Sequence, residues 1–351
     1  LKRGFGARAA EASGCTRPPM ALAGSSRLAA APTHSLVAPS APALAVRRCN
    51  VTLLPRRGAR TCRPPVYPLD NLFNFLHNWD GVQGFIGMGT VYMIHFVSLL
   101  QCDLGVTGAI GEIGVAGGKS FAGLAFTRRE GEALVACDLF KTGKEKDNVP
   151  DANLPLFLDV LEEVQIPAED VVILQQSSLQ LGDSDLVNLA TASRRRIRER
   201  VGQYRLFHVD GAHYMEAALF DLNNAACAMV AGGVVLVDDL HNMGYPGVME
   251  GFHRYMQEEG VARQLVPFLW TGRLFLTTPG YAAAYRRAIL RAHPGLTTVT
   301  LYDEPVLSAP PHLLDITVKD FAWLLLPPAR GATGRPHARG MSVPGGGERG
   351  S

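Results

Sequence analysis

The sequence predicts an α/β protein built on a doubly wound, mostly parallel seven-stranded sheet with an antiparallel edge strand. Two observations support this fold class. Six short apolar runs alternate with helical patterns between residues 109 and 270, and this alternation is typical of a parallel sheet covered by helices. The last two runs are separated only by Thr271, Gly272 and Arg273. Such a link is too short for a crossover, so these two strands should run antiparallel.

The expected elements follow from the apolar periodicity. Strands are predicted at 109–113, 134–138, 171–174, 206–210, 233–238, 266–270 and 274–278, and helices at 120–127, 154–164, 185–201, 214–230 and 248–259. In the helix at 214–230, apolar residues recur three and four positions apart, which predicts one buried face. Two more helices, around 72–76 and 85–100, precede the sheet. They form either a cap over a ligand crevice or a packing layer.

The charge divides the chain into three parts. Residues 1–69 hold 11 Lys and Arg but a single acid, residues 70–325 have a net charge of −11, and residues 326–351 are basic again. The first part is rich in Ala, Ser, Pro and Arg, which is typical of a transit peptide for a chloroplast or mitochondrion. A disordered extension of a cytoplasmic protein is the alternative. We expect the last part to be a disordered tail, which leaves 70–325 as the folded domain.

Composition also limits the partners. The acidic folded part argues against nucleic acid as a partner. The longest apolar run, 85–100, is short for a bilayer and contains His95, so no membrane span is expected. The cysteines include no C-x-x-C pair, so no zinc site is indicated. The five Arg between 194 and 200 are interpreted as an exposed helix face rather than a patch for an acidic partner.

A glycine-rich turn, GAIGEIGVAGGKS at 108–120, joins the first strand to the first helix of the alternation. In open α/β sheets, nucleotide-like cofactors bind at such turns, at the carboxyl ends of central strands. A phosphate-binding P-loop would need glycine where Ile113 stands, and the three-residue spacing of Gly111, Gly114 and Gly117 does not fit the dinucleotide motif. Both the nucleoside triphosphatases and the nicotinamide dehydrogenases are therefore less favoured.

Acidic residues flank this turn. Glu112 precedes the turn glycines Gly114 and Gly117, and Asp138 ends the next predicted strand, 21 residues after Gly117. A carboxylate at the end of that strand can accept hydrogen bonds from both hydroxyls of a ribose. An N-cap is the alternative role for Asp138. The sequence thus predicts a cofactor that contains a nucleoside.

Acids also end two later strands. Asp210 ends the strand LFHVD, and Asp238 and Asp239 end GGVVLVDD. Sequential parallel strands usually lie side by side, about 4.8 Å apart, so these carboxylates should converge. No Lys or Arg is near them in sequence, so they would repel one another unless protonated or neutralised by a cation. Oxygen ligands select Mg²⁺ or another divalent cation. His213 starts the following helix and can take a proton there; helix capping is the alternative role for these residues.

Together these segments resemble the class I S-adenosylmethionine-dependent methyltransferases. The resemblance is to the metal-dependent O-methyltransferases in particular, in the branch that contains macrolide-sugar and other natural-product enzymes. It covers residues 85–278 and rests on EIGVAGGKS at 112–120, CDLF at 137–140, HVDGAHYMEA at 208–217, GGVVLVDDLH at 232–241 and TGRLFLTT at 271–278. It implies a Rossmann-like methyltransferase fold.

The resemblance implies roles in cofactor binding for the residues that match the family's motifs. The methionine part of S-adenosyl-L-methionine would be lined by Glu112, Gly114 and Gly117. Asp138 would bind its ribose. Ser177 or Ser178, after the third strand, would bind the adenine edge.

The resemblance also implies a metal and a reaction. Asp210, Asp238 and Asp239 correspond to the family's magnesium ligands, and His213 stands where related catechol enzymes carry a lysine base. A hydroxyl of a small-molecule acceptor would bind Mg²⁺, lose its proton to His213 or Asp210, and attack the sulfonium methyl group. Two other functions stay open: a catalytically inactive, methyltransferase-like binding or scaffold domain, and a nucleotide-dependent enzyme on the same fold. The acceptor is not specified by the sequence, and a homo-oligomer is possible.

Overall fold

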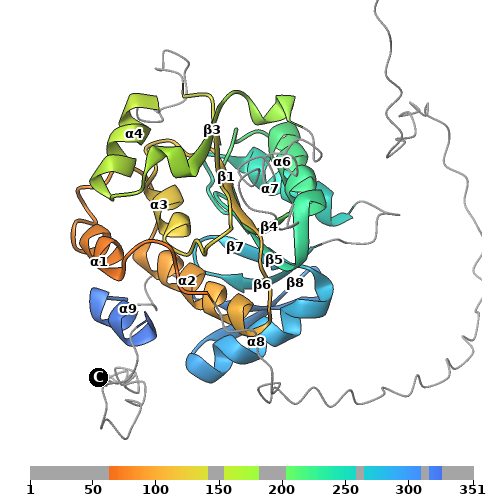
Figure 1. The fold of residues 1–351 in the computed structure, drawn as a ribbon. Coiled ribbons are helices and arrows are strands. Elements are labelled where there is room, and N and C mark those ends of the chain that lie inside the picture. Colours follow the sequence, from red (N-terminus) through yellow and green to blue (C-terminus); the bar gives the residue numbers. More distant parts are fainter. Residues whose placement is uncertain (1–62, 141–153, 182–202, 258–264, 310–315, 326–351) are drawn as a thin grey trace, which may run out of the picture. The chain divides into compact units, whose positions relative to one another are not determined.

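A nine-stranded sheet forms the centre of the structure, a computed structural model that describes residues 63–140, 154–181, 203–257, 265–309 and 316–325 (Figure 1). The predicted extension before residue 63, the helix at 185–201 with its arginines, and the tail 326–351 lie outside these ranges. The elements described below all belong to one compact unit of the chain.

The sheet has the strand order β3-β2-β1-β4-β5-β7-β6-β9-β8. Its strands are β1 (Ala109–Ile113), β2 (Leu134–Asp138), β3 (Val171–Gln175), β4 (Tyr204–Val209), β5 (Met229–Val237), β6 (Val266–Trp270), β7 (Leu274–Thr277), β8 (Thr297–Leu301) and β9 (Glu304–Ser308). Strands β3, β2, β1, β4 and β5 are parallel. Strand β7 runs antiparallel to both β5 and β6. The predicted fold class is confirmed, and the first seven strands lie close to their predicted ranges.

Two strands were not predicted from the sequence. Strands β8 and β9 form an antiparallel hairpin, and β9 extends the sheet by pairing parallel with β6. As a result the antiparallel edge strand is β8, and β7 lies inside the sheet. The residues of β8 are largely exposed, so the strand has no apolar alternation, and β9 contains Pro305, which is rare inside strands. The turn uses Tyr302 and Asp303 with positive φ, where the usual signal is glycine or asparagine.

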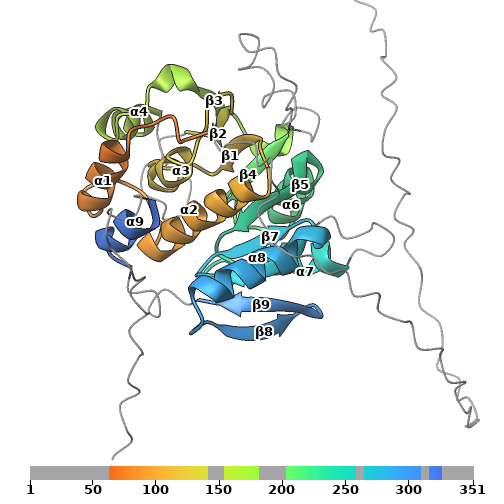
Figure 2. The ribbon, with the colours of Figure 1, turned by 60° about the horizontal axis from the view of Figure 1, so that its bottom comes forward.

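Helices cover both faces of the sheet (Figures 1 and 2). The described helices are α1 (Leu69–His77), α2 (Met88–Asp103), α3 (Lys119–Ala125), α4 (Leu154–Glu163), α6 (Met215–Ala228), α7 (Pro246–Gln257), α8 (Pro279–Ala292) and α9 (Val318–Leu325). Helices α6 and α7 pack on one face and the other helices on the opposite face. Successive residues of a strand point to opposite faces, so Val234 and Leu236 of β5 join one core while Val235 and Val237 join the other.

The two N-terminal helices form a packing layer. Phe75 of α1 and Val91 of α2 are buried in the core on one face of the sheet, and the Phe75 ring lies 5.5 Å from that of Phe126. The loop between these helices, by contrast, reaches the carboxyl edge of the sheet, where Phe85 lines a cavity. No helix among the described residues is long and apolar enough to span a bilayer.

A buried polar network closes the amino edge of the sheet. Arg205 is fully buried and donates hydrogen bonds to Glu132 (2.7 Å), to the Gln101 side chain (2.9 Å) and to the Thr127 carbonyl (2.6 Å). Glu132 also accepts a bond from the backbone N–H of Arg129. Buried charges are tolerated when they are paired and hydrogen-bonded, so this network is explained by its role in the fold. The polar residues predicted as ligands lie at the opposite, carboxyl edge of the sheet.

Candidate functional site

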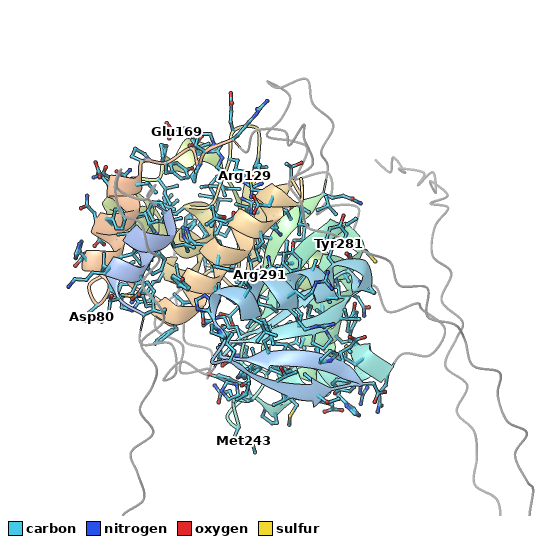
Figure 3. All side chains as sticks on the ribbon, turned by 90° about the horizontal axis from the view of Figure 1, so that it is seen from below. Asp80, Arg129, Glu169, Met243, Tyr281 and Arg291 are labelled. Atoms are coloured by element: carbon cyan, nitrogen blue, oxygen red, sulfur yellow. The ribbon has the colours of Figure 1, made fainter. Side chains whose placement is uncertain are left out.

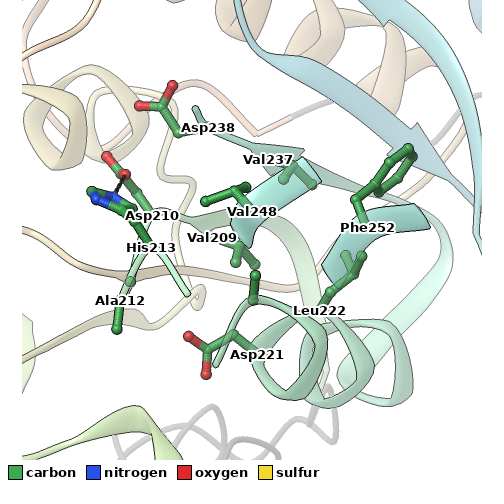
Figure 4. Close-up of a pocket in the computed structure, with 12 residues that line it drawn as sticks. Val209, Asp210, Ala212, His213, Asp221, Leu222, Val237, Asp238, Val248 and Phe252 are labelled. Atoms are coloured by element: carbon green, nitrogen blue, oxygen red, sulfur yellow. Dashed lines mark hydrogen bonds and ion pairs between the residues drawn. The ribbon is translucent and has the colours of Figure 1, made fainter. Parts of the chain in front are cut away.

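The carboxyl edge of the sheet brings together the polar residues that the sequence predicted as ligands. They lie at the ends of β1 to β5 or in the turns that follow these strands. Figure 4 shows those that line one pocket at this edge, among them Asp210, His213 and Asp238. They form three groups: the glycine turn with Glu112 and Asp138, the serines after β3, and an acid cluster made of Asp210, Asp238, Asp239 and His213.

The glycine turn after β1 needs glycine for two different reasons. Gly114 has a φ of +82°, and a Cβ at this position would overlap the backbone carbonyl of Asp210. A Cβ at Gly117 would lie 2.9 Å from the carbonyl oxygen of Gln83, in the loop between α1 and α2. The glycine turn therefore contacts Asp210 on one side. On the other side it contacts Gln83, which lines a cavity.

Glu112, at the end of β1, lies below the turn. It is 1% exposed, and its Oε1 accepts a hydrogen bond from the Ser120 hydroxyl (2.6 Å) and contacts Nδ1 of His208 (2.6 Å). Its Oε2 is buried and has no hydrogen-bond partner among the described residues. An orphaned carboxylate oxygen at this depth is a feature that a donor group of a ligand would satisfy.

A cavity of about 200 Å³ lies next to the turn. It is lined by Asp80, Val82, Gln83, Gly84, Phe85, Ala116, Gly117, Lys119 and Leu156. Lys119 lies over the Trp79 ring, with Nζ 4.3 Å from the ring centroid. Burial lowers the pKa of the Lys119 ammonium group, and the negative charge of Asp80 partly opposes this shift. The cavity is therefore bounded by the glycine turn and by the loop that precedes α2.

Asp138 ends β2 beside the same turn. Its Oδ2 accepts a hydrogen bond from the backbone N–H of Ala116 (2.9 Å), and its Oδ1 accepts one from that of Phe140 (2.8 Å). A carboxylate has about four lone-pair sites, so two acceptor sites remain for a ligand. The structure thus places Asp138 next to the glycine turn, as a ribose-binding role requires.

The two serines after β3 differ in their partners. Ser177 caps a short 3₁₀ turn by accepting a hydrogen bond from the Leu179 N–H (3.3 Å). The Ser178 hydroxyl donates to Oδ2 of Asp221 (3.1 Å) on α6. Burial raises the pKa of Asp221 to about 7 although the bond from Ser178 lowers it, and its Oδ1 has no partner among the described residues. Asp221 was not predicted from the sequence, because an acid inside a helix gives no signal of burial.

In the acid cluster, His213 lies between two carboxylates. Its Nε2 is 3.4 Å from Oδ1 of Asp210 and 3.3 Å from Oδ2 of Asp239, and Figure 4 shows the imidazole directed toward Asp210. The ring of Tyr245 packs on the imidazole at 4.1 Å. Burial lowers the pKa of His213, but the two carboxylates outweigh it and the pKa is raised.

Arg273 is the cation that the sequence analysis missed. It is 7% exposed and forms a close ion pair with Oδ2 of Asp238. No Lys or Arg is near these acids in sequence, but the fold brings Arg273 to Asp238. The reason is topological: the hairpin between β6 and β7 folds back beside β5, so a residue 35 positions after Asp238 reaches it. The short link Thr271-Gly272-Arg273 between two predicted antiparallel strands was the sequence signal that could have identified Arg273.

The carboxyl groups of Asp210 and Asp238 differ in pKa. Burial and the nearby charge of Asp238 raise the pKa of Asp210 to about 7. Burial acts in the same direction on Asp238, but the Arg273 guanidinium is the main group that opposes it, and the pKa of Asp238 is lowered. Two carboxyls whose environments separate their pKa values are suited to different roles, one as proton acceptor and one as permanent charge.

Two groups of potential metal ligands share Asp210. In one group, ligand atoms of Asp210, His213 and Asp239 lie within 4.8 Å of one another; in the other, those of His208, Asp210 and Asp238 do. Carboxylate oxygens with an imidazole nitrogen fit a divalent cation. In the second group, however, both His208 nitrogens contact other side chains and Asp238 is paired with Arg273. The first group fits a cation better.

The loop after β5 supports Asp239. The backbone of Asp239 has a φ of +50°, and its Oδ1 accepts a hydrogen bond from the Asn242 side chain (3.0 Å). The His241 ring packs edge-on against Trp270 at 4.8 Å. Met243, in the same loop, projects from the surface and is 82% exposed (Figure 3). The loop thus holds the Asp239 carboxylate beside the cluster.

Comparison with known proteins gives a family match for this region. Residues 112–240 match a family model described as a methyltransferase domain. The match spans the glycine turn, Asp138 and all three predicted acids. It confirms the resemblance to methyltransferases over these residues. No curated protein matches the chain.

Solved structures are similar at low identity. The O-methyltransferase NovP is 16% identical, with a TM-score of 0.39, over 55% of this chain and 81% of that chain. CalS11, a TDP-rhamnose 3'-O-methyltransferase of calicheamicin biosynthesis, is 18% identical, with a TM-score of 0.37, over 60% and 84%. An O-methyltransferase from Bacillus cereus in complex with SAH is 13% identical, with a TM-score of 0.38, over 60% and 91%.

Proposed function

We propose that this chain, whose residues 112–240 match a methyltransferase domain, transfers the methyl group of S-adenosylmethionine to a hydroxyl of a small molecule, with the help of Mg²⁺ or another divalent cation. One observation carries the proposal: the glycine turn and the acid cluster are in contact. Gly114 packs directly against the backbone of Asp210. A methyl donor in the turn and a hydroxyl bound at the acids would therefore be neighbours, as methyl transfer requires.

The residues beside the glycine turn fit the cofactor. The cavity at Ala116 and Gly117 would hold the methionine part. The orphaned Oε2 of Glu112, at the end of β1, is an acceptor for a donor group of the cofactor. The two free acceptor sites of Asp138 suit the ribose, and Ser177 or Ser178 suits the adenine edge. The bound cofactor supplies an electrophilic methyl group.

The acid cluster supplies the groups for the acceptor. A divalent cation, when bound, lowers the pKa of a coordinated hydroxyl and fixes its direction. Asp210 and Asp239 would hold it, and Asp238 is the third acid that the resemblance implies as a ligand. The hydroxyl proton would pass to His213 or to Asp210, either of which can act as a general base.

The experiment is a calorimetric titration of the full chain with S-adenosylhomocysteine, with and without Mg²⁺, and with ATP and NAD as controls. We expect saturable binding of S-adenosylhomocysteine near micromolar, equivalent to about 8 kcal/mol. Methyl transfer to a panel of hydroxyl compounds should then be lost in EDTA. Binding of ATP or NAD instead would overturn the proposal, and S-adenosylhomocysteine binding with metal-independent transfer would overturn its cation part.

We further propose import into a chloroplast or mitochondrion, because residues 1–69 have the composition of a transit peptide. Expression of the chain with a C-terminal fluorescent protein tests this. Organelle fluorescence that becomes cytoplasmic when residues 1–62 are removed is the expected result. Unchanged distribution of the truncated chain would contradict it.

A further inference from the structure

A chain of buried side-chain contacts joins the floor of the glycine turn to the acid cluster. Glu112 contacts Nδ1 of His208 (2.6 Å), and Nε2 of His208 lies 3.2 Å from Nε of Arg273. A guanidinium can only donate hydrogen bonds, so Nε2 of His208 accepts and the ring carries its proton on Nδ1. Arg273 in turn forms the ion pair with Asp238. The chain of contacts therefore ends on a predicted metal ligand.

Each oxygen of Asp238 already has one donor within the protein. Oδ2 faces Arg273, and Oδ1 accepts a hydrogen bond from the backbone N–H of Asp239 (2.8 Å). A divalent cation at Asp238 would also lie beside a buried guanidinium, and like charges repel strongly where water is excluded. Asp210 and Asp239 instead face each other across His213.

Arg273 has a third partner in the wall of the cavity. Its Nη2 donates a hydrogen bond to the backbone carbonyl of Phe85 (2.7 Å). Phe85 belongs to the loop that lines the cavity beside Gly117, and its side chain is 69% exposed. The planar fork of an arginine can hold several acceptors in a fixed geometry, which a lysine cannot do. Arg273 thus connects Asp238 to the segment that borders the cofactor cavity.

We propose that Arg273 takes the place of a metal ion at Asp238. Under this proposal, which rests on the proposed function, the divalent cation is held by Asp210 and Asp239, and Asp238 is a positioning residue. Asp238 acts through Arg273, by fixing the carbonyl of Phe85 and with it the wall of the cofactor cavity.

Cation binding is the first test and needs no turnover. Mn²⁺ binding to the full chain is measured by electron paramagnetic resonance for the wild type and for Asp239→Asn, Asp238→Asn and Arg273→Gln. Asp239→Asn should weaken Mn²⁺ binding by more than about tenfold, a loss typical of damage to a metal site. Asp238→Asn should change it less than threefold, and Arg273→Gln should tighten it, because Asp238 is released. Equal losses for both aspartates, or no Mn²⁺ binding by the wild type, would overturn the proposal.

Cofactor binding in EDTA is the second test, because a metal ligand would have no effect on it there. Asp238→Asn and Arg273→Gln should each weaken S-adenosylhomocysteine binding, and the double variant should be no weaker than either single one, since both break the same connection. Arg273→Lys, which keeps the charge but not the fork, should behave like Arg273→Gln. Wild-type affinity in both single variants would refute the positioning role. A wild type that binds Mn²⁺ as described but no S-adenosylhomocysteine would refute the proposed function instead. Circular dichroism spectra confirm that each variant is folded.

Discussion

Gly114 and Asp210 are in backbone contact: a Cβ on Gly114 would overlap the carbonyl group of Asp210. The backbone N–H of Asp210 also donates to the carbonyl of Ile113 (2.9 Å). The end of β1 and the end of β4 are therefore locked together at the place where the two halves of the site meet. Any side chain at position 114 must separate them.

Gly114→Ala should destabilise the fold and prevent cofactor binding. Alanine at positive φ costs about 1–2 kcal/mol, and the overlap with Asp210 adds strain, so we expect a total of about 3 kcal/mol or more. Gly131→Ala is the matched control: Gly131 has a φ of +83°, but a Cβ there meets nothing within 4 Å. Urea unfolding of both variants measures the difference. Equal losses would mean that only the backbone angle matters.

Asp221 should make stability depend on pH. Its pKa is about 7 in the folded chain, against 3.8 for an ordinary aspartate, because of burial. The folded state therefore keeps a proton that the unfolded state releases between these pH values. The stabilisation is fully present below pH 3.8 and is lost as pH rises toward 7, by up to about 1.4 kcal/mol per pH unit.

The measurement compares the wild type with Asp221→Asn by urea unfolding at several pH values. The stability of the wild type minus that of the variant should fall between pH 4 and 7 and then stay constant. Asp159→Asn, at an exposed position of α4, is the control and should show no such trend. A flat difference for Asp221→Asn would show that this carboxyl titrates normally.

Local sequence signals predicted most of the fold and the location of the site. Apolar runs gave β1, β2 and β6 their observed limits, and the acids at strand ends identified the carboxyl edge. The predictions failed where a position depends on distant parts of the chain. Arg273 reaches Asp238 only because β7 inserts between β5 and β6, and Asp221 is an acid whose burial has no local signature. The roles of the predicted ligands stay predictions.

Glu132→Gln should be strongly destabilising although it lies far from the site. It would leave the fully buried Arg205 without a charged partner, and breaking a buried pair costs about 3–5 kcal/mol. The control is Glu250→Gln, which removes an exposed pair with Arg254 on α7 and should cost about 0.5 kcal/mol or less. Thermal unfolding of both variants tests this. A small loss for Glu132→Gln would mean that the hydrogen bonds of the network suffice without the charge.

Asp210→Asn and His213→Gln should lower turnover by different amounts while leaving S-adenosylhomocysteine affinity within about threefold. General-base removal costs roughly 10²-fold or more in rate, and Asp210→Asn loses both a proton acceptor and a cation ligand. It should therefore have the larger effect. His213→Gln loses the proton acceptor but keeps the Asp210 and Asp239 carboxylates of the cation site, so raising the Mg²⁺ concentration should not restore its rate. Asp103→Asn, at an exposed position of α2, is the control for a change of charge. Wild-type turnover by the His213→Gln variant would contradict a role for His213 in the reaction and would leave Asp210 as the base. The imidazole would then only separate the Asp210 and Asp239 carboxylates.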